Sequence, residues 1–207
     1  MRFNLFIISI IIICLCSSIK AQQKPVILEI DVNDPVGKML PIYAFFGYDE
    51  PNYTYYENGR KLLAEIADLS PVPVYVRTHN LLTSKEGEPD LKWGFTNVYT
   101  EDPKGNPIYD WTILDKILNT QVEHGLIPLV ELGFMPKALS TNPEPYKHEW
   151  KTTGNIFTGW TYPPKDYKKW AELIYQLVMH QKEVHGENEI KKWLWEVWNE
   201  PDIGYWS

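Results

Sequence analysis

The chain has 207 residues, a formal net charge of -7 and 14% aromatic residues, among them 9 Trp and 13 Tyr. The negative charge and the lack of a basic patch argue against nucleic acids and anionic membranes as partners, because both require clustered lysine and arginine. Aromatic faces also stack on the C–H faces of sugar rings, so the composition favours a carbohydrate ligand without establishing one.

The first 21 residues are typical of a secretory signal peptide. Arg2 supplies a positive charge, an apolar run of about twelve residues follows, and small polar residues lead to Ala21. This run is shorter than the roughly 18 residues that a membrane-spanning helix requires, so we expect cleavage near Ala21 and no stable membrane insertion. The signal peptide predicts an exported, periplasmic or secreted protein. Both cysteines lie in the signal peptide, so we expect the mature protein to rely on a packed core instead of disulfides.

Residues 22–39 are interpreted as an N-terminal extension. Within it, four apolar residues alternate with mostly polar neighbours, namely Val26, Leu28, Ile30 and Val32. This period of two predicts a half-exposed strand, which ends at Asn33-Asp34-Pro35. We expect an accessory β element here and assign it no catalytic role.

Residues 40–207 show buried strands in alternation with amphipathic helices. Strands are predicted at residues 41–46, 72–78, 127–133 and 193–200. The first helix follows from its apolar face of Leu62, Leu63, Ile66 and Leu69. The second helix runs from an N-cap at Asp110 to Gly125, and the third follows Pro163-Pro164 and ends at His185-Gly186.

Four strands and three helices in this order predict an α/β fold with a parallel sheet and right-handed crossovers. A complete TIM (β/α)8 barrel takes about 250 residues, so we expect residues 40–207 to form its N-terminal half, truncated after strand four. Residues 81–109 and 134–162 are predicted to be long loops. Because loops of this length in compact domains are usually functional or disordered, their aromatic residues favour a functional role.

The stretch from Trp193 to Pro201 carries the chemistry. It predicts an aromatic-rich strand that delivers Asn199 and Glu200 at its C-terminal end, the end that forms the binding face in such folds. Side chains alternate along a strand, so the two residues can point the same way only where the chain turns, and Pro201 supplies that turn. A carboxyl group among aromatics is favoured in its protonated form and can donate a proton. The alternative is a structural ion pair of Glu200 with a preceding lysine, Lys191 or Lys192.

At Trp198-Asn199-Glu200-Pro201 the chain resembles glycoside hydrolase family 39, which belongs to a clan of (β/α)8-barrel glycosidases whose fourth strand ends in Asn-Glu. The resemblance covers most of the mature chain through four further segments: Gly47-Tyr48-Asp49-Glu50-Pro51-Asn52-Tyr53, Arg77-Thr78-His79-Asn80, Thr100-Glu101-Asp102 and Gly133-Phe134-Met135-Pro136. It implies a retaining hydrolase of β-linked glycosides, with β-xylosidase the best-known activity of the family.

The resemblance further implies that Glu200 is the general acid/base and that Asn199 binds the 2-hydroxyl of the sugar that is cleaved. It places the nucleophile on a seventh strand, beyond Ser207, so we expect these 207 residues alone to be inactive and prone to aggregate. A noncatalytic carbohydrate-binding protein that has lost the nucleophile is the alternative. The residues after Ser207 distinguish the two.

Other candidates for sugar binding have structural alternatives. The family pattern suggests that His79 binds a sugar hydroxyl, and a satisfied core histidine is the alternative. Three aromatic residues can wall the pocket or simply pack: Phe46, Trp93 and Phe134. Glu131 and Glu196 precede the strand ends and are predicted to be structural partners of Arg77, because buried charges are paired.

No cofactor is implied by the sequence. The five histidines do not show metal-ligand spacing, and phosphate loops, dinucleotide fingerprints and Gly-x-Ser-x-Gly elbows are missing. The expected partner is therefore a carbohydrate substrate. Neither the sugar nor the oligomeric state follows from the sequence.

Overall fold

The computed structural model of the chain describes residues 26–84, 94–150 and 154–202, so the expected signal peptide and Trp93 lie outside the described residues. The chain divides into two units, Met1–Leu40 and Pro41–Ser207. Within the described residues, none of the helices is both long enough and apolar enough to cross a bilayer.

Residues 26–40 do not contain the expected strand. The turn predicted after it is present, because the Asp34 amide donates to the Asp31 carbonyl over 3.3 Å and the Asn33 amide to the Asp31 side chain over 2.9 Å. The alternating apolar side chains are more than four-fifths exposed, for example 82% at Leu28 and 85% at Val32. A strand requires a neighbour for its backbone groups, and among residues 26–40, the part of this unit that the structure describes, the segment has none.

The main sheet consists of four parallel strands in the order β1 (Phe45–Tyr48), β2 (Tyr75–Thr78), β5 (Ile127–Glu131) and β8 (Leu194–Glu196). Strands that are neighbours in this sheet thus follow one another along the chain, because the remaining strands β3, β4, β6 and β7 form separate two-stranded sheets. This is the arrangement of consecutive β/α units in a TIM (β/α)8 barrel, and it confirms the predicted fold class.

All four strands are shorter than predicted, and the first starts four residues later than expected. Residues 41–44 form a turn, in which the Ala44 amide donates to the carbonyl of Pro41 over 3.0 Å. Pairing with β2 therefore begins only after this turn, at Phe45. At the other end of the sheet, pairing of the last strand stops at Glu196, three residues before Asn199.

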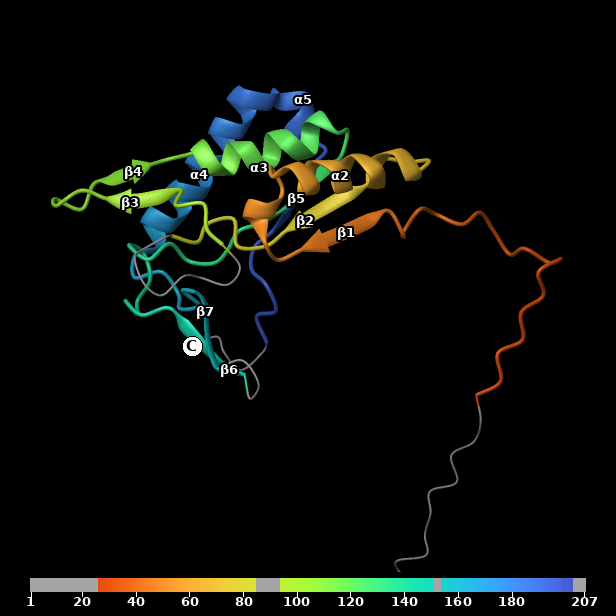
Figure 1. The fold of residues 1–207 in the computed structure, drawn as a ribbon, viewed down its shortest axis with the longest axis horizontal. Coiled ribbons are helices and arrows are strands. Elements are labelled where there is room, and N and C mark those ends of the chain that lie inside the picture. Colours follow the sequence, from red (N-terminus) through yellow and green to blue (C-terminus); the bar gives the residue numbers. More distant parts are fainter. Residues whose placement is uncertain (1–25, 85–93, 151–153, 203–207) are drawn as a thin grey trace, which may run out of the picture. The chain divides into compact units, whose positions relative to one another are not determined.

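Helices α2 (Glu57–Leu69), α3 (Thr112–Glu123) and α4 (Tyr167–His185) follow β1, β2 and β5 and lie on one side of the sheet (Figure 1). Two short helical turns accompany them, η1 (Pro51–Tyr53) and α5 (Glu187–Ile190). All three predicted helices are therefore confirmed.

The ends of the helices follow local chemistry. The Asp110 carboxylate accepts the Thr112 amide, although α3 begins after Trp111, one residue later than predicted. Gly125 follows α3 with φ of 73°, a value that glycine adopts without strain. Asp166 caps α4 by accepting the amides of Lys168 and Lys169. Leu69, predicted to face inward, is 85% exposed because it occupies the last position of α2.

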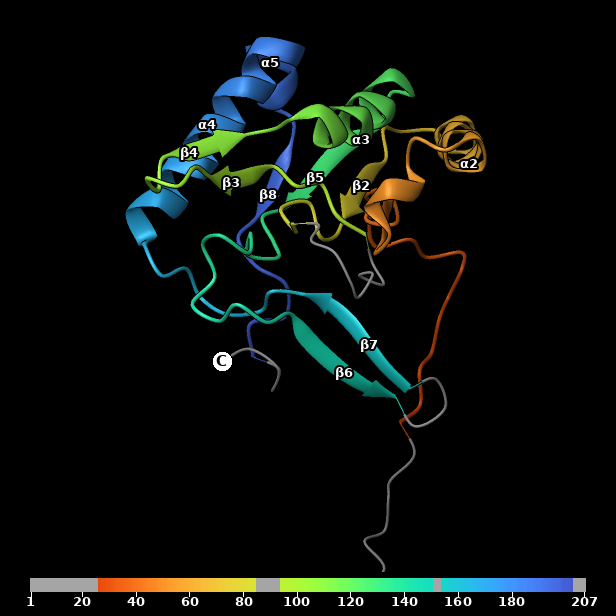
Figure 2. The same cartoon turned by 60° about the vertical axis from the view of Figure 1, so that its left-hand side comes forward.

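The two predicted long loops contain antiparallel hairpins that were not expected from the sequence. One pairs β3 (Tyr99–Glu101) with β4 (Pro107–Tyr109), and the other pairs β6 (Tyr146–Trp150) with β7 (Gly154–Gly159). The first is held against α4 by an ion pair of 2.8 Å between Glu101 and Lys169. The second lies beyond the strand ends, away from the helices (Figure 2).

The two faces of the sheet differ in chemistry. Val76 and Val130 are fully buried and pack towards the helices together with Trp195. Because side chains alternate along a strand, the residues that follow them, Arg77 and Glu196 among them, lie on the opposite face. The face of the sheet that packs against the helices is apolar, so Arg77 and Glu196 lie on the other face, which is the interior side in a barrel.

We expect Leu177→Ala to lower the free energy of unfolding of the full-length protein that carries this chain by about 2–5 kcal/mol, because it empties a fully buried site of α4. Tyr175→Ala on the same helix is the control. Tyr175 is 57% exposed, so its loss should cost less than about 0.5 kcal/mol. Chemical denaturation measures both, and equal losses would contradict the inward orientation of Leu177.

Candidate active site

The candidate site lies where the four parallel strands end. Asp49 follows β1, His79 follows β2, Phe134 follows β5 and Asn199 follows β8, and the strands point to the same edge of the sheet (Figure 2). In barrels of this type the C-terminal ends of the strands form the binding face. Residues from four separate chain segments are thereby brought together.

Arg77 links β2 to the end of β8. Its Nε atom donates to Glu196 Oε2 over 2.6 Å and its Nη2 atom to Glu196 Oε1 over 3.0 Å. The same Nη2 atom donates to Asn199 Oδ1 over 2.8 Å. Burial alone would lower the pKa of Arg77, but the hydrogen bonds and charge of Glu196 outweigh it and raise the pKa above its usual value. The prediction that Glu196 pairs with Arg77 is thus confirmed.

Asn199 and Glu200 lie side by side beyond the strand, as the turn at Pro201 predicts. Glu200 has φ of 41°, a left-handed conformation that is uncommon outside glycine, and its Oε2 atom lies 3.4 Å from Asn199 Nδ2. Asn199 is only 9% exposed to solvent, whereas Glu200 is exposed. The left-handed turn therefore brings the two side chains into contact although they are neighbours in sequence.

The alternative of an ion pair between Glu200 and a preceding lysine is not realised. Lys191 pairs with Glu187 over 2.7 Å, and Lys192 pairs with Glu189 over 2.6 Å. Both acidic partners belong to α5, at the opposite end of β8 from Glu200. The strand thus separates these lysines from the candidate acid.

His79 lies between two carboxylates. Its Nδ1 atom is 3.5 Å from Asp49 Oδ1, its Nε2 atom is 3.4 Å from Glu131 Oε2, and its ring packs edge-on against Phe134 at 4.9 Å. Burial, and then the charge of Arg77, lower the pKa of His79 to about 4, although Asp49 opposes the shift. His79 is therefore a neutral imidazole at neutral pH.

Glu131 is fully buried, and the prediction that it pairs directly with Arg77 is wrong. Its Oε2 atom accepts the Asn80 amide over 3.1 Å and faces His79, while Arg77 acts on it through its charge. Its Oε1 atom is without a hydrogen-bond partner among the described residues. Burial raises the pKa of Glu131 to about 8, against the opposing effects of the Asn80 amide and of Arg77. The carboxyl group is consequently protonated at neutral pH.

Gly133 leaves the space that Glu131 occupies. A Cβ atom at this position would lie 2.2 Å from Glu131 Oε1. Any larger residue would push the carboxyl group away from His79. Glycine at position 133 therefore lets the Glu131 carboxyl group stay beside His79.

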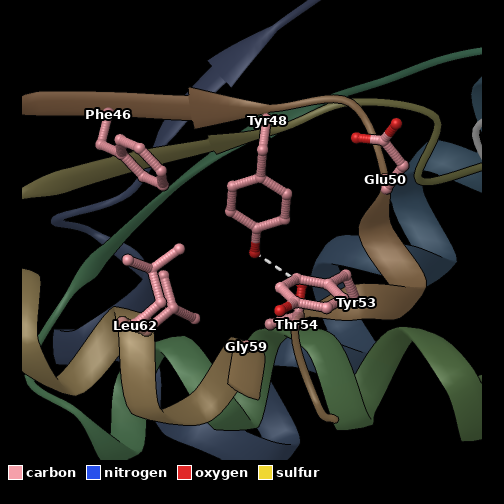
Figure 3. Close-up of a pocket in the computed structure, with 8 residues that line it drawn as sticks. Phe46, Tyr48, Glu50, Tyr53, Thr54, Gly59 and Leu62 are labelled. Carbon is pink, nitrogen blue, oxygen red and sulfur yellow. Dashed lines mark hydrogen bonds between the residues drawn. The ribbon is translucent and has the colours of Figure 1, made fainter.

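The predicted aromatic wall residues are not all brought together. Phe134 is fully buried beside His79 and Trp198, with a ring distance of 6.2 Å to Trp198. Phe46 points the other way, towards α2, where it lines an apolar pocket of about 260 Å3 with Tyr48 and Leu62 (Figure 3). Phe46 thus belongs to the helix-facing side of β1 because side chains alternate along the strand.

Two residues near the strand ends were not assigned a role from the sequence. Asp49 faces the ring of His79, and Trp198 packs between Phe134 and Trp170. Both lie in the segments that carried the family resemblance, so their position after a predicted strand was the available signal. Beside them, Trp170, Trp198 and Pro201 help to line a pocket of about 360 Å3.

Metal ligands do not cluster in the described part of the chain, where no group of three or more His, Cys, Asp or Glu side chains could hold an ion. The polar groups of the site are instead bound to one another. Arg77 neutralises Glu196, and Glu131 is neutral through its proton. The arrangement offers a hydrogen-bonding amide beside an exposed carboxylate, which suits proton transfer to a bound substrate.

Comparisons with known proteins identify the family and agree with the fold. Residues 29–206 match the family described as glycosyl hydrolases family 39. The chain is 37% identical over 137 residues to a beta-xylosidase of Geobacillus stearothermophilus, and the aligned region covers 64% of this chain and 24% of the relative. It is 39% identical over 90 residues to a beta-xylosidase of Caldicellulosiruptor saccharolyticus, covering 44% of this chain and 17% of the relative.

A solved structure matches the fold as well. The crystal structure of the GH39 enzyme from Xanthomonas axonopodis pv. citri superposes with a TM-score of 0.62 and 26% identity, covering 78% of this chain and 28% of that one. The chain thus spans about a quarter of the length of the Geobacillus stearothermophilus relative and of this structure.

We expect Glu131→Gln to remove a pH dependence of stability. A carboxyl pKa raised from 4.5 to about 8 stabilises the folded state fully below pH 4.5, and this contribution is lost as pH rises through 8. The lowered pKa of His79 acts in the opposite direction, but only between about pH 4 and 6.5. The thermal midpoint of the full-length protein should therefore fall between pH 6.5 and 8, and in the variant it should not.

Glu65→Gln is the matched control, because the Glu65 side chain is 59% exposed on α2. This control should keep the fall in midpoint between pH 6.5 and 8. An unchanged pH profile in Glu131→Gln would show that Glu131 is ionised throughout this range.

Proposed function

This chain belongs to glycosyl hydrolases family 39, and from that membership we propose that the full-length protein is a retaining hydrolase of β-linked glycosides with β-xylosidase-like specificity. The observation that carries the proposal is the pair Asn199 and Glu200, held in contact at the end of the fourth parallel strand. The beta-xylosidases among the relatives support the choice of substrate.

Glu200 is the general acid/base of the proposed reaction. It donates a proton to the glycosidic oxygen as the bond to the leaving group breaks, and later takes a proton from the water that releases the sugar. Its exposure in this chain suits that role, because a leaving group has to reach it.

The nucleophile of the proposed mechanism is a further carboxylate, about 5–5.5 Å from the acid in retaining enzymes. Two interior carboxyl groups of this chain are poorly suited to it. Glu131 is fully buried behind His79 and protonated, and Glu196 is bound twice by Arg77. The family resemblance instead implies a residue on the seventh strand of the barrel.

Asn199 is proposed to hydrogen-bond the 2-hydroxyl of the sugar that is cleaved. A bond that strengthens as the ring flattens towards an oxocarbenium ion stabilises the transition state more than the substrate. Phe134 and His79 are proposed to wall the same subsite. We further propose that the protein acts outside the cytoplasm, as the expected signal peptide indicates.

Glu200→Gln in the full-length protein should lower kcat/KM for xylobiose, whose leaving group needs protonation, by about 10²–10⁴-fold. Hydrolysis of a dinitrophenyl β-xyloside should fall far less, because that leaving group departs without a proton. Steady-state kinetics on the two substrates measures the difference.

Asp202→Asn is the matched control, since it neutralises an exposed carboxylate two residues away. This variant should retain activity on both substrates. Equal losses on both substrates in Glu200→Gln would refute the acid role, and wild-type protein that binds xylobiose without cleaving it would favour the noncatalytic alternative.

A further inference from the structure

The orientation of the Asn199 amide is determined by Arg77. A guanidinium group has only donors, so the Asn199 atom that faces Arg77 Nη2 at 2.8 Å has to be the oxygen. The amide nitrogen is thereby directed away from Arg77, and it lies 3.4 Å from Glu200 Oε2. Arg77 thereby fixes which end of the Asn199 side chain is the hydrogen-bond donor.

Arg77 in turn is held by Glu196. The carboxylate accepts both Nε and Nη2, at 2.6 and 3.0 Å, which is the paired geometry that restricts rotation of the guanidinium plane. The charge of Asp49 also attracts Arg77. Without Glu196, the Asp49 carboxylate, which follows β1, would compete for the guanidinium group.

The chain of contacts runs from Glu196 through Arg77 to Asn199 and ends at Glu200. Glu196 and Asn199 belong to one segment, yet their link passes through β2, on the far side of β5. Because Arg77 binds both oxygens of Glu196, the link from Glu196 to Asn199 passes through the Arg77 guanidinium group.

We propose that Glu196 is a positioning residue, which holds Arg77 against Asn199 Oδ1 and so directs the Asn199 amide nitrogen to the sugar 2-hydroxyl. This inference rests on the proposed function. Its consequence is that Glu196 controls how strongly the rate depends on the 2-hydroxyl, while proton donation by Glu200 is unaffected.

The test compares kcat/KM of the full-length protein for a nitrophenyl β-xyloside and for its 2-deoxy analogue. Glu196→Gln keeps the size of the side chain but replaces one acceptor by a donor that repels Arg77. The ratio of the two kcat/KM values should fall by about tenfold, as expected for one misaligned hydrogen bond in the transition state. The dependence of kcat/KM on the pKa of the leaving group should not change.

A double-mutant comparison isolates the path through Asn199. In an Asn199→Ala background, Glu196→Gln should change the 2-hydroxyl ratio by less than about twofold, because the group that it positions is already gone. Glu123→Gln is the control, since it breaks a pair with Arg60 at 3.0 Å outside the site and should leave the ratio unchanged. If Glu196→Gln does not fold, Glu196→Asp replaces it, because it keeps the charge but shortens the reach to Arg77.

Equal loss on both substrates, or additive effects of Glu196 and Asn199 substitutions, would overturn the inference while the proposed function stands. Wild-type protein that hydrolyses neither substrate would overturn both. A reduced 2-hydroxyl ratio that is absent in the Asn199→Ala background, with an unchanged leaving-group dependence, is the result that supports it.

Discussion

The pairing of Arg77 with Glu196 is the interaction on which the arrangement of the site depends. It connects β2 to the end of β8 across the intervening strand β5 and leaves Arg77 with a further bond to Asn199. The two side chains are only 26% and 29% exposed. Charges withdrawn from water to this extent need close partners, and here the pair also orients the amide beside the candidate acid.

The electrostatics of the interior follow from this pair. Arg77 is bound to one of the carboxyl groups, so the others are stabilised in different ways. Glu131 is buried and keeps its proton, with a pKa of about 8, while Asp49 lies at the rim, where its side chain is 53% exposed. His79 is neutral between them. Among these ionisable groups, the buried charges are therefore those of the pair Arg77 and Glu196. Glu200 is exposed at the end of β8.

Several features were predictable because they depend on neighbours in sequence. The apolar period predicted all three long helices, and the order of strands and helices predicted the parallel sheet. The turn at Pro201, with Asn199 beside Glu200, followed from the alternation of side chains along a strand. Residue Phe46 shows the limit of such reasoning, because a shift of one residue moves a side chain to the other face of the sheet, and the sequence does not reveal where pairing begins.

The sequence by itself determined the fold class, the family and the position of Asn199 and Glu200 at the end of a strand, since these depend on periodicity and on short contiguous motifs. The tertiary structure alone decided which carboxyl group binds Arg77, which one keeps its proton beside His79, and which way the Asn199 amide points. These outcomes depend on burial and on distances of about 3 Å between groups as many as 122 residues apart in the chain, and no local pattern encodes such contacts.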